Sequence, residues 1–373
     1  MSKDNIELDK KIDRIDYLDG IRGYAILLVI IGHGTKSIPN DSYWKRVFVF
    51  LGNEYLGVEI FFVLSGFLIT KLLLNEYNKN GSIEIKKFFI KRILRIFPVF
   101  YLYVLVIYIL KSLGLLVIQT SIFAIAIFYL FNYRPLFPIE YTNDEWYLMH
   151  LWSLSMEEQF YIIWPFLIAF FSFKKMPTVV TVLLVLFPFF RLASYYLLPD
   201  FRGNMNYMFH TAGDCILYGC LGALLLNFNF VYVKKFLVVF EKINIYIAAF
   251  VILFILSPML QTTWLPTKSG FITHVIDPLC IICLIIWLIE SKNKLWKLFN
   301  NKFIVTLGMY SYSIYIWQQL FLTKQNTTFT GMFPFNYIFT FILAWVSYNL
   351  VEKQFLKLKS RLISSRMETT SKI

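Results

Sequence analysis

Long apolar segments recur from one end of the chain to the other, with short polar connections between them. Each segment is long enough to cross or nearly cross a bilayer as a helix. They lack the alternation of apolar and polar residues that is typical of transmembrane β-strands. This pattern predicts an all-α protein, a polytopic transmembrane helix bundle, and leaves no connection long enough for a soluble domain. The segments cover residues 21–38, 56–74, 88–110, 114–131, 154–173, 178–198, 209–228, 243–258, 271–290, 303–322 and 333–352.

Lysine and arginine residues concentrate at both ends of the chain and in several of the connections. Cytoplasmic loops carry an excess of these residues, so we expect both termini in the cytoplasm and the protein in the cell inner (cytoplasmic) membrane. Residues 1–20 would then form a cytoplasmic tail, 21–352 the transmembrane domain and 353–373 a basic cytoplasmic tail. Eleven full crossings would place the C-terminus outside, against its charge. We therefore favour about ten crossings, with 114–131 re-entrant or interfacial.

The composition also indicates a surface covered largely by lipid. Hydrophobic residues make up 58% of the 373 residues and charged residues 16%, whereas a soluble domain carries roughly a quarter charged residues. The net charge of +13 is spread over loops and tails, so the positive-inside tendency explains it without a nucleic-acid partner. Cys280 and Cys283 have metal or redox spacing but lie in an Ile- and Leu-rich run without a second cysteine pair. We interpret them as small buried hydrophobic residues and expect no metal cofactor.

The first apolar segment contains two polar residues of interest, Arg22 and His33. They lie eleven residues apart, which is about 16 Å along a straight helix, so they cannot act together on one substrate atom. Arg22 alone is typical of a side chain that extends to the cytoplasmic headgroups, and His33 alone is compatible with an interhelical hydrogen bond. Polar groups at membrane depth are costly and are frequently functional. We therefore favour a functional role for His33.

Two later segments carry further candidates. Arg92 and Arg95 share one helix face at the cytoplasmic start of the third segment. Two guanidinium groups there suit phosphate binding, although an ordinary positive-inside anchor would look the same. Glu157 and Glu158 are adjacent near the start of another segment and point to different helix faces. A general preference for acidic residues at helix N-termini would also explain them.

Taken together, six segments resemble the family-3 membrane acyltransferases, which are O-acyltransferases that modify bacterial sugars. The segments occur in the family's order and read LDGIRGYAILLVIIGH, GVEIFFVLSGFLIT, KRILRIFP, HLWSLSMEEQFYIIWP, SYSIYIW and VEKQF. The family's Arg-x10-His motif falls on Arg22 and His33. Its Arg-x-x-Arg motif falls on Arg92 and Arg95, and the glutamate of its WSLxxE motif on Glu157. The resemblance covers nearly the whole chain.

Two positions depart from the family's pattern. The family often has a histidine directly after the SYSxYxW run, where this chain has Gln318. The closing Glu-x-Pro motif reads Glu352-Lys353-Gln354, without the proline, so we assign no catalytic role to it. About twenty residues follow the last apolar segment, and the extra extracytoplasmic hydrolase-like domain frequent in the family is not among them. We expect acceptor handling to fall to the membrane domain alone or to a partner.

The resemblance implies an acyl-CoA donor from the cytoplasm, usually acetyl-CoA, and an acceptor hydroxyl on a sugar or glycan. Arg92 and Arg95, helped by Arg22, would hold the CoA phosphates. His33 would act as general base on the acceptor hydroxyl, and a transient acyl-histidine relay is the less favoured variant. Glu157 would orient His33 or the acceptor.

Other expectations concern neighbouring residues and alternative functions. Trp152 and Tyr312 are candidates for contacts with the substrate, Asp19 for pairing with an arginine, and glycan-synthesis proteins for partners. Two other classes stay open. One is a transporter that exports a glycan intermediate or a small acid, with the buried polar residues lining its path. The other is a polysaccharide-synthesis scaffold without catalysis of its own; the inverted repeat that would favour a transporter is not visible in the sequence.

Overall fold

The computed structural model describes residues 16–228, 231–242, 244–261, 270–291, 296–323 and 327–358. Residues 1–15 and 359–373, which make up most of the two predicted tails, lie outside this described part. Within it the chain is helical and contains no β-strand, which confirms the all-α prediction. The α-helices are α2 (Asp16–Gly34), α3 (Tyr43–Leu51), α4 (Glu54–Asn80), α5 (Ile85–Ser112), α6 (Thr120–Ile127), α7 (Trp146–Met149), α8 (Leu151–Leu197), α9 (Phe209–Ala212), α10 (Asp214–Asn227), α11 (Val231–Lys242), α12 (Ile245–Val251), α13 (Ser257–Met259), α14 (Gly270–Ser291), α15 (Trp296–Phe299), α16 (Lys302–Phe321) and α17 (Phe335–Ser347). Two π-helical stretches, Ile252–Leu256 and Tyr348–Glu352, continue α12 and α17.

Several helices of the described chain are suited to a lipid bilayer. Large apolar side chains such as Phe170 and Phe189 remain 80% and 62% exposed, as expected where a helix faces lipid. The protein is therefore a multi-pass membrane protein, while the number of ten crossings stays a prediction. In the described part of the chain, four helical stretches are long and apolar enough to cross a membrane, namely Tyr43–Asn80, Ile85–Ser112, Asn143–Leu197 and Gly270–Glu290. Shorter apolar stretches cover Asp214–Asn227 and Ile245–Met259.

The helix boundaries refine two of the predicted segments. Within 114–131 the α-helical part is α6, which has 8 residues. Eight residues span about 12 Å, less than half of the ~30 Å hydrocarbon core, so α6 is too short to cross by itself. In α8, Ser172 has a φ of 59° and a ψ of 153°, so two helices meet there. This break lies close to the predicted boundary between 154–173 and 178–198.

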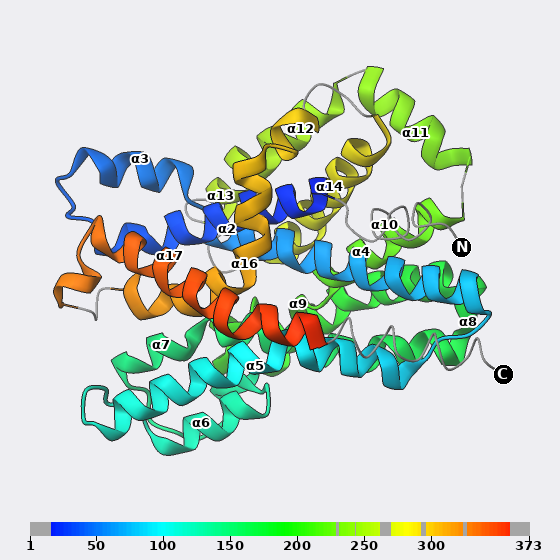
Figure 1. The fold of residues 1–373 in the computed structure, drawn as a ribbon. Helices are drawn as coiled ribbons and strands as arrows, with labels where there is room; N and C mark the ends of the chain where they lie inside the picture. The colour runs from blue at the N-terminus through cyan, green and yellow to red at the C-terminus, as the bar shows by residue number, and fades with distance from the viewer. Residues whose placement is uncertain are drawn as a thin grey trace.

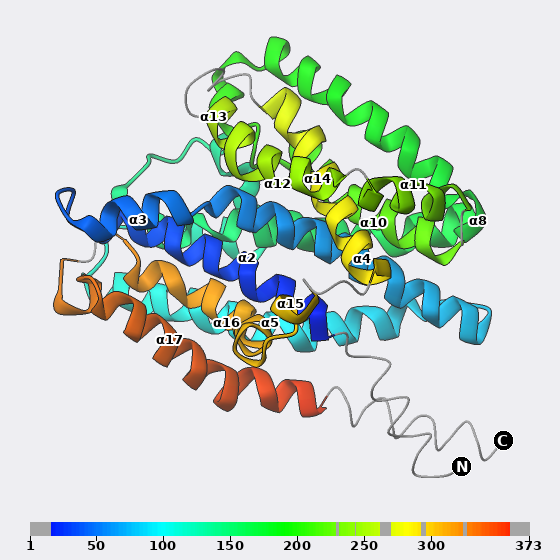
Figure 2. The same ribbon diagram turned by 90° about the horizontal axis from the view of Figure 1, so that it is seen from above.

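α2 lies between α4 and α16 and packs closely against both (Figure 1, Figure 2). Glycine permits the close contact with α16, because a Cβ on Gly308 would overlap the backbone carbonyl oxygen of Asp19. A Cβ on Gly23 would likewise overlap the carbonyl oxygen of Ile304. The polar residues of α2 are therefore brought directly against those of α16.

A second group of helices packs on the other side of α4. α10 and α14 both contact α4, and Figure 2 shows them on the side away from α2. A Cβ on Gly66 would overlap the carbonyl oxygen of Ile216 in α10, so a glycine also sets this helix spacing. Phe62 belongs to the hydrophobic cluster shared with α5 and α8, whereas Phe67 belongs to the one shared with α10 and α14. α4 therefore joins two packed regions of the molecule.

Candidate active site

Arg22 is held by a carboxylate one helical turn earlier on α2. Its Nη1 donates to Asp19 Oδ1 at 3.0 Å, and the Arg22 side chain is 22% exposed. This contact confirms the expectation that Asp19 pairs with an arginine. The ion pair uses one of the five N–H donors of the guanidinium, so other donors remain for a ligand.

Arg92 and Arg95 lie one turn apart on α5. The guanidinium carbon of Arg92 lies 4.6 Å from the centre of the Tyr161 ring and 5.8 Å from that of Phe88. Stacking on aromatic faces holds the side chain without consuming its N–H donors. Within the described residues, neither Arg92 nor Arg95 forms an ion pair with a carboxylate. Both guanidinium groups are therefore available to an anionic ligand.

Glu157 joins these arginines from α8. The Tyr161 hydroxyl donates to Glu157 Oε2 at 2.7 Å and lies 3.0 Å from the Ser65 hydroxyl. Arg92 and Arg22 lie within electrostatic range of the Glu157 carboxylate. Glu157 is therefore part of the charged group around the arginines.

Glu352, at the end of the π-helical stretch that continues α17, also belongs to this charged group, although its motif lacks the proline of the family pattern. Ser313 of α16 donates to Glu352 Oε2 at 2.8 Å, and the carboxylate is buried. Arg95 and Arg22 lie within electrostatic range. The sequence analysis assigns no catalytic role to the Glu352 motif, and the packing of the last helix against α16 brings its carboxylate beside the arginines. We refer to Arg22, Arg92, Arg95, Glu157 and Glu352 as the arginine layer.

The two predicted substrate contacts lie apart from each other. The Tyr312 hydroxyl donates to the backbone carbonyl oxygen of Ile96 at 2.6 Å, which ties α16 to α5 directly after Arg95. Tyr312 therefore positions the arginines of α5. Trp152 lies elsewhere, with its ring edge-on to Tyr207 at a centroid distance of 4.8 Å.

His33 contacts α16 from the opposite end of α2. Its Nδ1 lies 3.1 Å from Gln318 Oε1, and its ring is edge-on to Trp146 at a centroid distance of 5.9 Å. With the Gln318 amide oriented so that its oxygen lies against the ring, Nδ1–H donates to that oxygen and Nε2 is the basic nitrogen. Gln318, which stands where the family often has a histidine, therefore fixes the tautomer of His33.

A second histidine and amide lie beside the first pair. Gln319 Oε1 lies 2.7 Å from His150 Nδ1 and accepts from the His150 backbone N–H at 3.1 Å. His150 is buried and lies within electrostatic range of His33. Two consecutive glutamines of α16 thus each hold one histidine. We refer to His33, Gln318, His150, Gln319 and Trp146 as the histidine layer.

The candidate residues therefore fall into two layers that share α2 and α16. Arg22 and His33 belong to different layers, as their separation of about 16 Å along a helix predicts. The contacts of Glu157 favour a role beside the arginines over the expected role of orienting His33. Such an arrangement can bind an anion at one level and move a proton at the other.

Comparison with known proteins extends the resemblance seen in the sequence. A family model described as an acyltransferase domain matches residues 15–350. A Staphylococcus aureus (strain COL) protein, provisionally named as an O-acetyltransferase, is 29% identical over 381 residues, which cover 93% of this chain and 58% of that protein. The O-acetyltransferase OatA of Staphylococcus aureus (strain NCTC 8325 / PS 47) is 28% identical over 355 residues, which cover 90% of this chain and 56% of OatA.

The matched lengths limit which conclusions can be carried over to this chain. The chain spans a little over half the length of each of these relatives. No solved structure matches it significantly. Because the family model covers most of the sequence, the chain belongs to the family-3 acyltransferases.

Proposed function

We propose that this protein is a membrane O-acyltransferase that moves an acyl group, most simply acetyl, from cytoplasmic acyl-CoA to a hydroxyl of a sugar or cell-surface glycan. Family membership and the O-acetyltransferase names of the two relatives support the reaction type. The observation that carries the proposal is the 3.1 Å contact between His33 Nδ1 and Gln318 Oε1. It leaves Nε2 of a half-buried histidine free to accept a proton.

The arginine layer would bind the donor. Arg92 and Arg95 present two guanidinium groups without carboxylate ion pairs in the described residues, and CoA carries phosphates that match guanidinium geometry. Glu157 and Glu352 hold the arginines by charge when the donor is absent, which limits the cost of keeping cations in a low-dielectric bundle. The pantetheine arm would extend from this layer toward His33.

The transfer step balances with His33 as the only proton carrier. His33 Nε2 takes the proton of the acceptor hydroxyl while the hydroxyl oxygen attacks the thioester carbonyl carbon. The new C–O bond forms, the C–S bond breaks, and CoA leaves as a thiolate that takes the proton from the His33 imidazolium. Gln318 holds Nδ1 through the whole cycle and so keeps Nε2 directed at the reacting atoms.

Transfer of label from radiolabelled acetyl-CoA to membrane glycans tests the proposal, with the full chain reconstituted in proteoliposomes. The wild type should label the glycans and His33→Ala should not. His210→Ala is the matched control, because His210 is another half-buried histidine, stacked on Tyr133 outside both layers. Label transfer by His33→Ala at the wild-type rate would remove the proposed base. Glycan movement across the bilayer without any labelling would instead support an exporter.

A further inference from the structure

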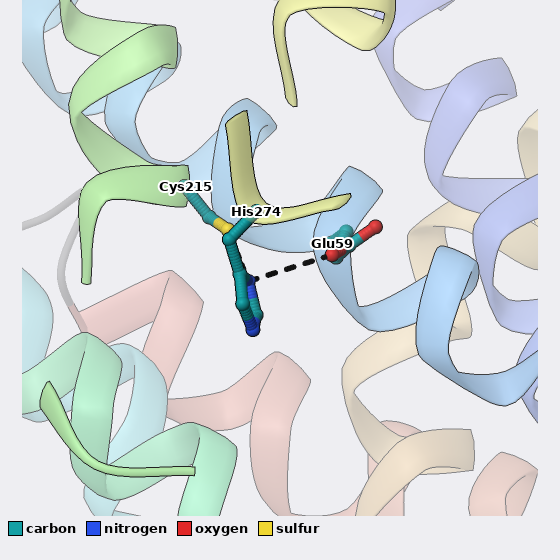
Figure 3. A group of neighbouring side chains, drawn as sticks. All are labelled: Glu59, Cys215 and His274. Carbon is teal, nitrogen blue, oxygen red and sulfur yellow. Dashed lines mark hydrogen bonds and ion pairs between the residues drawn. The ribbon is translucent and has the colours of Figure 1, made fainter. Parts of the chain in front are cut away.

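Three side chains with metal-binding atoms, none of them a member of either layer, converge between α4, α10 and α14 (Figure 3). They are Glu59, Cys215 and His274, and all three are buried. Cys215 Sγ lies 3.5 Å and Glu59 Oε1 3.8 Å from His274 Nδ1. One ligand atom from each residue lies within 4.8 Å of the others. No local sequence motif joins them, because each comes from a different helix.

Within the described residues, the carboxylate of Glu59 has no hydrogen-bond partner that would explain its burial. Glu59 is 8% exposed, and within the described residues it accepts no hydrogen bond, since 3.8 Å to His274 is too long for one. Asp214 and Asp277 lie within electrostatic range, and the nearby Arg191 is already bound to Asp214, with Nη2 2.6 Å from Oδ2. A buried carboxylate in acidic surroundings either takes up a proton or is paired with a cation, and the thiol and imidazole beside Glu59 would help to hold a cation.

His274 is oriented as a metal ligand would be. Its Nε2 lies 3.0 Å from Asn206 Oδ1, and because an amide oxygen only accepts, Nε2 carries the proton. Nδ1 is therefore the unprotonated nitrogen, and Cys215 Sγ and Glu59 Oε1 lie 3.5 and 3.8 Å from it. Metal-bound histidines characteristically donate their other N–H to an oxygen in this way.

The distances and donor types identify the class of ion. In a tetrahedral Zn²⁺ site with bonds of about 2.0–2.3 Å, neighbouring ligand atoms lie ~3.5 Å apart, close to the 3.5 and 3.8 Å found here. Thiolate, imidazole and carboxylate are all Zn²⁺ ligands, whereas Mg²⁺ and Ca²⁺ prefer oxygen alone. We propose that Glu59, Cys215 and His274 together bind one divalent transition-metal ion, for which Zn²⁺ is the best match.

Three protein ligands leave one coordination position open. A cavity of about 30 Å³ lies against the cluster and is also lined by Trp152, Asn206 and Gln261, and it has room for a water on the ion. The ion would clamp α10 and α14 to α4 and complete the charge balance of this region. It would also lie in the same cavity as Trp152, which the sequence predicts as a substrate contact.

Metal analysis of the purified full chain tests the site directly. Wild-type protein isolated without chelator should contain one Zn²⁺ per chain by mass spectrometry of the elements, and Cys215→Ser should contain about a tenth or less. Cys220→Ser is the matched control, because Cys220 is buried on the same helix, with its Sγ 3.5 Å from the Gly66 carbonyl oxygen. It should keep the full metal content. Wild-type protein without stoichiometric metal, which also binds none on addition, would overturn the proposal.

Two further measurements, one with Co²⁺ and one on the exposed neighbour Asn206, distinguish loss of a metal ligand from a folding defect. Co²⁺ bound in place of Zn²⁺ should give a thiolate-to-metal charge-transfer band that Cys215→Ser lacks and Cys220→Ser retains. Asn206 is exposed, so Asn206→Ala should fold normally and weaken metal binding by about 10-fold through the loss of its bond to His274. An unchanged affinity in Asn206→Ala together with an unchanged cobalt spectrum in Cys215→Ser would contradict the assignment of these ligands.

Discussion

The arginine layer and the histidine layer use the same two helices for different chemistry. In the arginine layer, guanidinium groups lie within electrostatic range of the carboxylates of Glu157 and Glu352. In the histidine layer, neutral amides hold the two histidines, and Gln318 is 0% exposed. Lys36 and Glu54 are charged groups within electrostatic range of His33, while its ring is hydrogen-bonded to Gln318. Charged groups recognise an anion, whereas neutral amides orient an imidazole without adding a second buried charge.

This difference explains why the two layers are separated along the helices instead of sharing one pocket. A cation close to His33 opposes its protonation. Lys36, with Nζ 4.0 Å from the centre of the Trp146 ring, is already such a neighbour, and the carboxylate of Glu54 offsets it. A cluster of guanidinium groups at the same level would add to that opposition. The rise of α2 places Arg22 and His33 about 16 Å apart, so the donor's phosphates and its acyl group can be held in different surroundings. Variants that act on one layer should therefore leave the kinetic parameter of the other layer unchanged.

The largest effect is expected from His33→Gln. Loss of a general base lowers the rate by about 10²–10⁴-fold, so kcat should fall by that factor. KM for acetyl-CoA should stay near the wild-type value because the arginine layer is intact. Steady-state kinetics in proteoliposomes measure both parameters. A large rise in KM with little change in kcat would show that His33 serves donor binding instead.

The double variant Arg92→Ala plus Arg95→Ala should show the reverse behaviour. Each charge-assisted hydrogen bond to phosphate contributes about 1.5 kcal/mol or more, so loss of two should raise KM for acetyl-CoA about 100-fold. The value of kcat at saturation should change much less. The control is Lys86→Ala plus Lys87→Ala, which removes two charges from the first turn of the same helix. A similar rise in KM in this control would show that the arginines contribute only to a general positive charge and do not bind the phosphates specifically.

The sequence predicts those features of the two layers that depend on local spacing. Segment lengths locate many of the helices, and the eleven-residue spacing predicts that Arg22 and His33 lie at different levels of one helix. The sequence does not predict which residues of distant helices become their partners. Gln318 lies 285 positions from His33, and their meeting depends on the register of α16 against α2, which the close packing of Gly308 sets.

The same limit applies to Glu157, to the further metal ligands and to the crossing number. Helical geometry shows that Glu157 and Glu158 point to different faces of their helix, but it does not show which helix packs against each face. The position of Glu157 beside the arginines therefore becomes visible only in the folded structure. Glu59, Cys215 and His274 each look isolated in an apolar run, because their cluster exists only where three helices pack. Hydropathy alone also makes 114–131 resemble a membrane-spanning segment. Its α-helical part, α6, is less than half as long as a helix that crosses the bilayer.

Gln318→Leu tests whether the amide supports His33. Leucine has a similar volume but no acceptor, so the His33 tautomer is no longer fixed and kcat should fall about tenfold, the worth of one hydrogen bond. Gln318 Nε2 has no partner within the described residues, so the loss of the amide should cost little thermal stability. Gln318→His, which introduces the residue frequent in the family, offers a ring nitrogen as acceptor and should recover most of the rate. Full activity in Gln318→Leu would separate Gln318 from catalysis.

The smallest effect, and the one most specific to the arginine layer, is expected from Glu352→Gln. The amide oxygen can still accept from Ser313, so the local hydrogen bond at 2.8 Å is preserved while the negative charge near Arg95 and Arg22 is removed. If these arginines bind phosphate, a competing anion is lost and KM for acetyl-CoA should fall about threefold, in the range of one weak ion pair. Kinetics at several salt concentrations measure this, because the gain should shrink as salt screens the charges. An unchanged KM with lower thermal stability would instead make the arginine layer a structural ion-pair network, and donor binding would have to lie elsewhere.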